Sequence, residues 1–216
     1  VMQSQSQSSP SSQSVSTMPR VIDPVNILCE RFVGYKVGEV QVNSKGAKSA
    51  RDENDGQQMI FNLGDRENPV LNPFGATTFN DELNSRQTIE FILDEKQSSH
   101  WAAFDTWAIA YISEHSERLF KKVLTIDQVK DTYKSPITRK EGYSPHLRCK
   151  INTTGEKACR AWNTNNARIE MPPLRNVPCV PRITLSHVWI MARETGFVLS
   201  VNDIMASPPP EIKCPY

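Results

Sequence analysis

The sequence predicts an α+β fold: an antiparallel, OB-like barrel or sheet with one long helix and a short second helix. Its most strongly β stretch is Pro181 to Met205, where apolar and polar residues alternate on both sides of a turn at Arg193 to Gly196. Between Ser99 and Phe120 the apolar residues instead recur at every third or fourth position, which is typical of a helix. Shorter β-type segments separated by Gly, Pro and Asn complete the pattern of a small barrel, and a plain α+β sandwich layer is nearly as compatible.

Length and composition fit one domain with tails. The chain has 216 residues, 38% of them hydrophobic, which is enough for a core of its own. We expect residues 1–20 to be a disordered Ser/Gln-rich tail, 21–206 a single β-rich domain with a helical insertion at 98–134, and 207–216 a Pro-rich C-terminal tail. No apolar run approaches the roughly 20 residues of a membrane helix, and no signal peptide is visible. We therefore expect no membrane span.

In the part of the chain before the long helix, strands are predicted from short β-type runs and loops from the polar and Gly-containing stretches between them. A polar, charged and Gly-containing stretch is typical of a loop, whereas a short run of β-branched and aromatic residues predicts a strand. In order, we predict one or two strands within Val21 to Val42, a long loop at Asn43 to Gln58, a short strand at Met59 to Phe61, a turn at Asn72 to Ala76 and a strand at Thr88 to Leu93.

The second half begins with the helices. Ser98 or Ser99 is the predicted N-cap of the long helix, which ends at Phe120. Thr125 and Gln128 have the spacing of a capping box, so a short helix is expected to open there and to end near Tyr133. The segments Leu147 to Ile151 and Ala158 to Trp162, on either side of Asn152 to Gly155, predict a second hairpin.

In the final hairpin, strict alternation places Ile183, Leu185, His187 and Trp189 on one face of the first strand. Trp189 and Phe197 are therefore predicted to be largely buried, and His187 is predicted to be a hydrogen-bonded core histidine. Gly196 is expected to close the turn with a positive φ.

Motifs for catalysis are missing from the sequence. It has no glycine-rich phosphate loop, no GxSxG and no HExxH, and its four histidines are isolated. We expect no enzyme, no catalytic residue, no cofactor and no metal. The five scattered cysteines without CxxC spacing favour an intracellular, reducing compartment, either the nucleus or an organelle.

The charge distribution points to a nucleic-acid-binding module. The formal net charge is +1, but Val21 to Glu117 holds 8 basic and 16 acidic residues, whereas Arg118 to Arg160 holds 11 basic and 4 acidic ones. Cations for phosphates and flat rings for unstacked bases are what a single strand needs. The predicted nucleic-acid-binding residues are Lys121, Lys122, Lys134, Arg139, Lys140, Tyr143, Arg148, Lys150, Arg160 and Trp162.

Two other interpretations stay open at this point. The basic segment can be a solvated face with Trp162 in the core. The chain can also be a non-catalytic structural or accessory subunit of a larger assembly, which kept the fold without nucleic-acid binding. Its partners would then be neighbouring protein subunits rather than single-stranded nucleic acid.

The order of several motifs resembles an uncharacterised family shared by large DNA viruses and dinoflagellate-type protists, related to viral OB-fold single-stranded-DNA-binding proteins. The resemblance runs from Asn72 to Met205 and implies an OB-like fold and binding of single-stranded DNA. Its matching pieces are Asn72 to Ala76, Thr88 to Leu93, Trp101 to Phe120 with SERLFKK, Thr125 to Val129, Tyr133 to Ser135, Tyr143 to Pro145, Leu147 to Ile151, His187 to Trp189 and Gly196 to Leu199.

Overall fold

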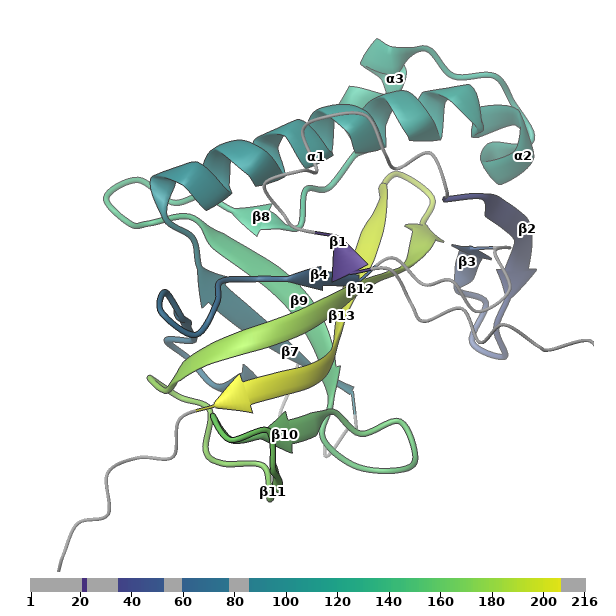
Figure 1. Ribbon diagram of the computed structural model, residues 1–216. Helices are drawn as coiled ribbons and strands as arrows, with labels where there is room; N and C mark the ends of the chain where they lie inside the picture. The colour runs from purple at the N-terminus through teal and green to yellow at the C-terminus, as the bar shows by residue number, and fades with distance from the viewer. Residues whose placement is uncertain (1–20, 23–34, 53–59, 78–85, 207–216) are drawn as a thin grey trace, which may run out of the picture.

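The structure is a computed structural model that describes residues 21–22, 35–52, 60–77 and 86–206 (Figure 1). The tails predicted at 1–20 and 207–216 lie outside these residues. The described residues form one large, mainly antiparallel sheet with three helices, so the predicted α+β class is confirmed. None of the helices in this part of the chain has the length and hydrophobicity that a membrane crossing requires.

The elements follow one another as strands, then helices, then strands again. The helices are α1 (Glu95–Glu114), α2 (Ser116–Phe120) and α3 (Ile126–Thr132). Before them come β1 (Val21–Ile22), β2 (Val37–Val42), β3 (Lys48–Asp52), β4 (Ile60–Asn62), β5 (Val70–Leu71), β6 (Ala76–Thr77) and β7 (Arg86–Ile92). After them come β8 (Ile137–Thr138), β9 (His146–Asn152), β10 (Arg160–Trp162), β11 (Arg168–Ile169), β12 (Pro178–Ile190) and β13 (Thr195–Ala206).

The sheet curls into a barrel around the long β12–β13 hairpin. Its main path runs β4-β12-β13-β9-β7-β6, and all of these neighbours are antiparallel except β13 and β9. On the other side β5 pairs with the start of β12 and also lies against β7, which brings the two ends of the path together. This arrangement agrees with the OB-like barrel expected from the sequence.

An aromatic cluster attaches α1 to the tip of this hairpin. Helix α1 lies across one end of the sheet (Figure 1), and its Phe104 and Trp107 rings are 5.9 and 5.4 Å from the ring of Phe197. Tyr35 also packs edge-on against Phe197, at 5.5 Å. Phe197 is buried, as predicted, and lies at the centre of the contact between helix and sheet.

The long helix differs from the prediction at both ends. It begins one turn earlier, because Asp94 and Gln97 form a capping box in which the Asp94 side chain accepts from the Gln97 N–H at 2.7 Å. It also stops at Glu114 and restarts at Ser116 as α2. The predicted capping box of the short helix is confirmed: the Thr125 hydroxyl accepts from the Gln128 N–H, and α3 ends before Tyr133.

A β-bulge overturns the predicted faces of β12. The pairing of β12 with β13 shifts between Leu185 and His187, so one extra residue interrupts the alternation. Ile183 and Leu185 are buried, but beyond the shift Val188 and Ile190 occupy the inner face. Because one extra residue moves all later side chains to the other face, His187 lies on the outer face, and Trp189 is only half-buried. The prediction of a core histidine is therefore wrong, and Trp189, expected to be largely buried, keeps part of its side chain exposed.

Gly196 has a different role from the one predicted. Its φ is not positive, and the turn before it is closed by Met191 donating to the Glu194 carbonyl at 2.8 Å. A Cβ at Gly196 would meet the Lys134 carbonyl oxygen at 2.6 Å and the Trp189 Nε1 at 3.1 Å. The glycine is needed for this close approach of the chain.

Two pairings also differ from the sequence prediction. The loop expected at Asn43 to Gln58 contains β3, which fills the space between β2 and β12. The second hairpin is not formed, because β10 does not pair with β9. Both strands instead run parallel to β13 along the same edge, β9 beside Ser200 and Val201, and β10 beside Asp203 to Met205.

Candidate nucleic-acid interface

The outer face of the barrel gathers basic residues from four strands. Arg51 of β3 pairs with His187 of β12, and Arg86 of β7 shares the outer face with Arg148 and Lys150 of β9. Strand β13, which lies between β12 and β9, presents the half-buried side chains of Val198 and Ser200. We call Arg51, Arg86, Arg148, Lys150 and His187 the cationic face.

The members of the cationic face are close enough to affect each other's ionisation. Burial lowers the pKa of Lys150, and the positive charges of Arg86 and Arg148 lower it further. The pKa of Arg86 is likewise lowered by burial and by Arg51. Burial lowers the pKa of His187 to about 4, with Arg86 and Arg51 adding to the effect, so this imidazole is neutral at pH 7. The face thus holds the like charges of its arginines and its lysine together around a neutral imidazole.

Few carboxylates compensate these charges. Glu90 accepts from the Arg148 Nε at 3.0 Å, and its other oxygen lies 3.3 Å from the His146 Nδ1. Lys150 donates to a neutral group, the Thr88 hydroxyl, at 2.8 Å. Within the described part of the chain, no carboxylate forms an ion pair with Arg51 or Arg86. An anion can therefore gain from approaching this face.

An exposed aromatic ring borders the cationic face. Phe74, in the turn predicted at Asn72 to Ala76, is 54% exposed, and its ring lies 5.6 Å from that of His146. The turn is held by the buried Asn72, whose side-chain oxygen accepts from the Phe74 and Gly75 N–H groups at 3.0 and 2.7 Å. His146 is two residues from Arg148 on the same face of β9, so a flat ring lies next to the cations.

The predicted pair Arg160 and Trp162 belongs to a different part of the surface. Both converge on Asp203 of β13: Arg160 donates two hydrogen bonds to its carboxylate, at 2.7 and 2.8 Å, and the Trp162 Nε1 donates one at 2.9 Å. These bonds hold the pKa of Asp203 below its usual range although burial opposes them, and they raise the pKa of Arg160. The charge of Arg160 is largely neutralised within the protein.

The remaining predicted residues are spread over the helical end of the molecule and the segment before β9. Lys134 forms an ion pair with Glu194 at 3.2 Å. Burial raises the pKa of the Asp105 carboxyl, and the nearby charge of Arg139 opposes this shift. Lys140 and Tyr143 are exposed before β9 begins. Lys121 and Lys122 follow α2 and line a separate pocket. Of the ten predicted residues, only Arg148 and Lys150 belong to the cationic face.

Sequence reasoning missed Arg51, Arg86 and His187. Arg51 stands in a segment predicted as a loop, and His187 was placed on the wrong side of β12. For Arg86 a signal existed: with Thr88 and Glu90 it continues the polar alternation of the predicted strand by one more residue.

Among the described residues, potential metal ligands lie apart from one another and the cysteines are buried. No group of three or more His, Cys, Asp or Glu side chains in them is placed to hold a metal ion. Cys149, Cys159 and Cys179 are free and buried, and burial raises the pKa of each thiol. A buried thiol with a raised pKa is a poor nucleophile.

Comparison with known proteins gives structural likeness alone. No protein-family model matches the chain, and no curated protein sequence matches it. Among solved structures, it is similar to gp2.5, a single-stranded DNA-binding protein encoded by bacteriophage T7, with a TM-score of 0.48, 8% identity, and coverage of 69% of this chain and 86% of that one.

It is also similar to the single-stranded DNA-binding protein of bacteriophage Enc34. The C-terminally truncated form gives a TM-score of 0.46 at 9% identity, covering 82% of this chain and 97% of that one. The form in complex with single-stranded DNA gives 0.44 at 7% identity, covering 82% and 94%. With likenesses this distant, the ligand of this chain has to be inferred from its own surface.

Proposed function

We propose that this chain binds single-stranded nucleic acid, DNA in the first instance, through the cationic face. The observation that carries the proposal is the convergence of Arg51, Arg86, Arg148 and Lys150 on one outer face, where Glu90 is the one carboxylate paired with any of them among the described residues. Bringing like charges together costs free energy in the unbound protein. A phosphate backbone that lies across them lowers this repulsion and releases its own counterions.

The shape of the face suits a single strand. It crosses five neighbouring strands from β3 to β7, a width of about 19 Å at the usual strand spacing. A single strand laid across it can place successive phosphates near Arg51, Arg86 and Lys150. Its bases are then free to stack on exposed rings, of which Phe74 lies at one border. Bases that are paired in a duplex could not use such a ring.

The test is the salt dependence of binding by the full chain. A fluorescent 20-nucleotide oligothymidine should bind with an affinity that falls as salt rises, with a log–log slope of about −2 to −3, because each neutralised phosphate contributes about −0.7. A duplex of the same length should bind more weakly, and an oligouridine probe measures the preference for DNA.

A double variant then localises the site. Replacing Arg148 and Lys150 by alanine should flatten the slope by one to two, whereas Lys130→Ala, on α3 and paired with Asp127, should leave it unchanged. If the wild-type chain shows no oligonucleotide binding at 50 mM salt, nucleic-acid binding is excluded, and the non-catalytic accessory subunit becomes the better hypothesis.

A further inference from the structure

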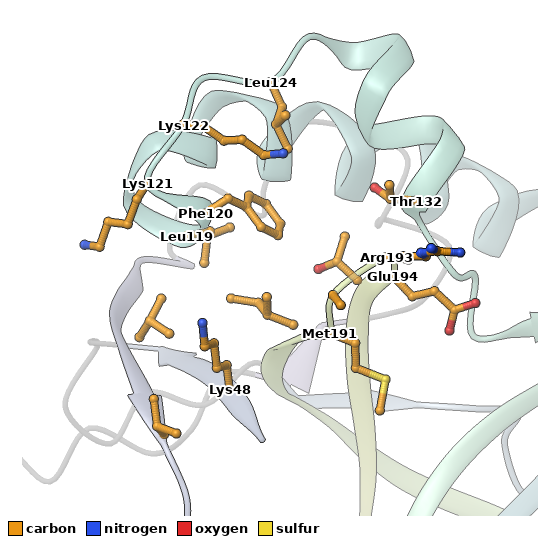
Figure 2. A pocket seen from close by; sticks show the side chains of 15 residues that line it. Lys48, Leu119, Phe120, Lys121, Lys122, Leu124, Thr132, Met191, Arg193 and Glu194 are labelled. Atoms are coloured by element: carbon orange, nitrogen blue, oxygen red, sulfur yellow. The ribbon is translucent and has the colours of Figure 1, made fainter. Parts of the chain in front are cut away.

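A second surface feature is a pocket of about 440 Å³ beneath α2 (Figure 2). On one side of it lie α2 and the segment that follows α2. On the other sides lie the strands β2 and β3 and the turn that joins β12 to β13. The residues that enclose it come from these regions and, in Thr132, from α3; the regions are distant in the sequence and adjacent in space. The volume is within the usual range for sites that bind a small molecule or a few side chains.

The inner surface of this pocket is mainly aliphatic. Val40, Leu119, Phe120 and Ile190, which are buried or half-buried, form its floor, and Met191, which is 64% exposed, also belongs to the lining. Phe120 is the one aromatic ring in the lining. An aliphatic floor with a solvent-exposed methionine favours burial of aliphatic side chains rather than stacking of bases.

The rim of the pocket is positively charged. It carries Lys48, Lys121, Lys122 and Arg193, and Figure 2 shows the ammonium group of Lys48 directed toward the hollow. Glu194 is the one acidic residue of the lining, and its carboxylate is held by Lys134 at 3.2 Å. The lining therefore complements carboxylates.

The pocket and the cationic face lie on opposite sides of the ribbon formed by β3 and β12. Lys48 shares a face with the buried Ala50, whereas Arg51 points the other way, because successive residues of a strand alternate between faces. Across the pairing, Ile190 is opposite Lys48, and His187 is opposite Arg51. A strand of nucleic acid on the cationic face would have to pass around the edge of the sheet to reach the pocket.

Among the described residues, β2 is an edge strand with which a partner could pair. Among the described strands, β3 is the one neighbour of β2, and Val40 and Val42 of β2 line the pocket. The other end of β2 is occupied, since the Val37 N–H donates to the Tyr111 hydroxyl at 2.9 Å. An extended peptide can lie along the Val40 end and insert a side chain between the lysines.

From these observations we infer that the pocket binds an acidic peptide segment of a partner protein, with an aliphatic side chain on the floor and flanking carboxylates on Lys48, Lys122 and Arg193. The site is separate from the proposed nucleic-acid interface and would recruit another protein while the cationic face is in use.

The probe is a fluorescein-labelled peptide, Asp-Asp-Leu-Asp-Ile-Asp-Leu-Asp-Asp, added to the full-length chain and followed by fluorescence anisotropy. We expect saturable binding that weakens with salt, as attraction to an exposed cationic rim requires. A peptide with alanine at the three aliphatic positions should bind at least about tenfold more weakly, because the floor then gains no apolar contact. Equal binding of the two peptides, or no binding at ~1 mM, overturns the proposal.

Matched variants place the peptide in the pocket. Met191→Asp in the lining should weaken peptide binding by roughly tenfold or more, whereas Val123→Asp, at an exposed apolar residue outside the lining, should not. Lys48→Glu with Lys122→Glu should weaken it further, and Lys130→Glu is the control for a charge change elsewhere. All these side chains are exposed, so unchanged thermal melting is expected and shows that the fold is kept.

Oligothymidine binding by the same variants separates the two sites. We expect it to change by less than about twofold in Met191→Asp, since the pocket lies behind the ribbon. A parallel loss of oligonucleotide and peptide binding would make the pocket part of the nucleic-acid path and overturn the proposal. Failure of oligonucleotide binding by the wild-type chain leaves the peptide result unaffected, because the two ligands are measured independently.

Discussion

Strands β9 and β10 run along the same edge of β13, and each carries two of the predicted binding residues. The two strands differ in how far carboxylates neutralise their basic side chains. On β9, Arg148 and Lys150 face Arg86, and one carboxylate, Glu90, is shared between Arg148 and His146. On β10, Arg160 is paired in two hydrogen bonds with its own carboxylate, Asp203. We therefore expect the number of basic residues in a segment to matter less for anion binding than which of them the fold leaves without a carboxylate.

The largest expected effect tests this comparison directly. Replacing Arg86 and Lys150 by glutamine should lower the affinity for oligothymidine by roughly tenfold to a hundredfold at 50 mM salt and flatten the salt slope by about 1.4. The same change of two charges at Lys157 and Arg160 should alter the slope by much less, because Arg160 is already neutralised. Anisotropy titrations at several salt concentrations measure both. Equal losses in the two double variants would contradict the assignment of the cationic face.

Removing the Asp203 carboxylate, which pairs with Arg160 of β10, should affect stability rather than binding. Asp203→Asn leaves the Arg160 guanidinium and the Trp162 N–H without their charged acceptor and should lower the free energy of unfolding by about 2 kcal/mol in urea titrations. Because the pKa of Asp203 is depressed in the folded protein, its contribution is present above the unfolded pKa and is lost as pH falls through the folded pKa.

The amide side chain that this substitution introduces does not titrate, so the stability difference between the two proteins should shrink on acidification below about pH 4. A difference that stays constant down to about pH 2 would show that the Asp203 carboxylate does not stabilise the fold through its charge.

The two candidate stacking rings should respond differently. Phe74→Ala should weaken oligothymidine binding by about 1 kcal/mol with the salt slope unchanged, because stacking releases no counterions. Trp162→Ala removes a ring whose N–H donates to Asp203. This substitution should lower the melting temperature clearly and change the affinity for oligothymidine only slightly. If anisotropy showed a larger loss of oligothymidine binding for Trp162→Ala than for Phe74→Ala, and thermal melting showed little loss of stability for Trp162→Ala, the stacking site would lie on β10.

The smallest effect is a change in ionisation on the cationic face. The pKa of His187 is about 4 in the free protein, below its unfolded value, so stability should fall as pH is lowered from about 6.5 toward 4. Bound phosphates would screen Arg51 and Arg86 and should raise this pKa by about one pH unit. An NMR titration of the His187 ring with and without oligothymidine measures the change. An unchanged pKa at saturation would mean that the nucleic acid lies elsewhere.

The sequence by itself determined those elements whose signals are local. The final hairpin, the strand around Ile89, the Thr125 capping box and the buried Phe197 all follow from alternation, helical spacing or hydrogen bonds within a few residues. The start of the long helix has an equally local signal in Asp94 and Gln97, and the prediction overlooked it in favour of a serine.

Tertiary structure decided which residues share a surface. The bulge before His187 reverses the faces of half a strand, and it depends on how β12 pairs with β13 rather than on its own sequence. The pairing of β10 with β13, and not with β9, gives Arg160 its partner Asp203, 43 residues away. The cationic face likewise joins Arg51 and Arg86 to Lys150 through contacts between strands far apart in the chain. Long-range pairing sets these neighbours, and no short-range pattern encodes it.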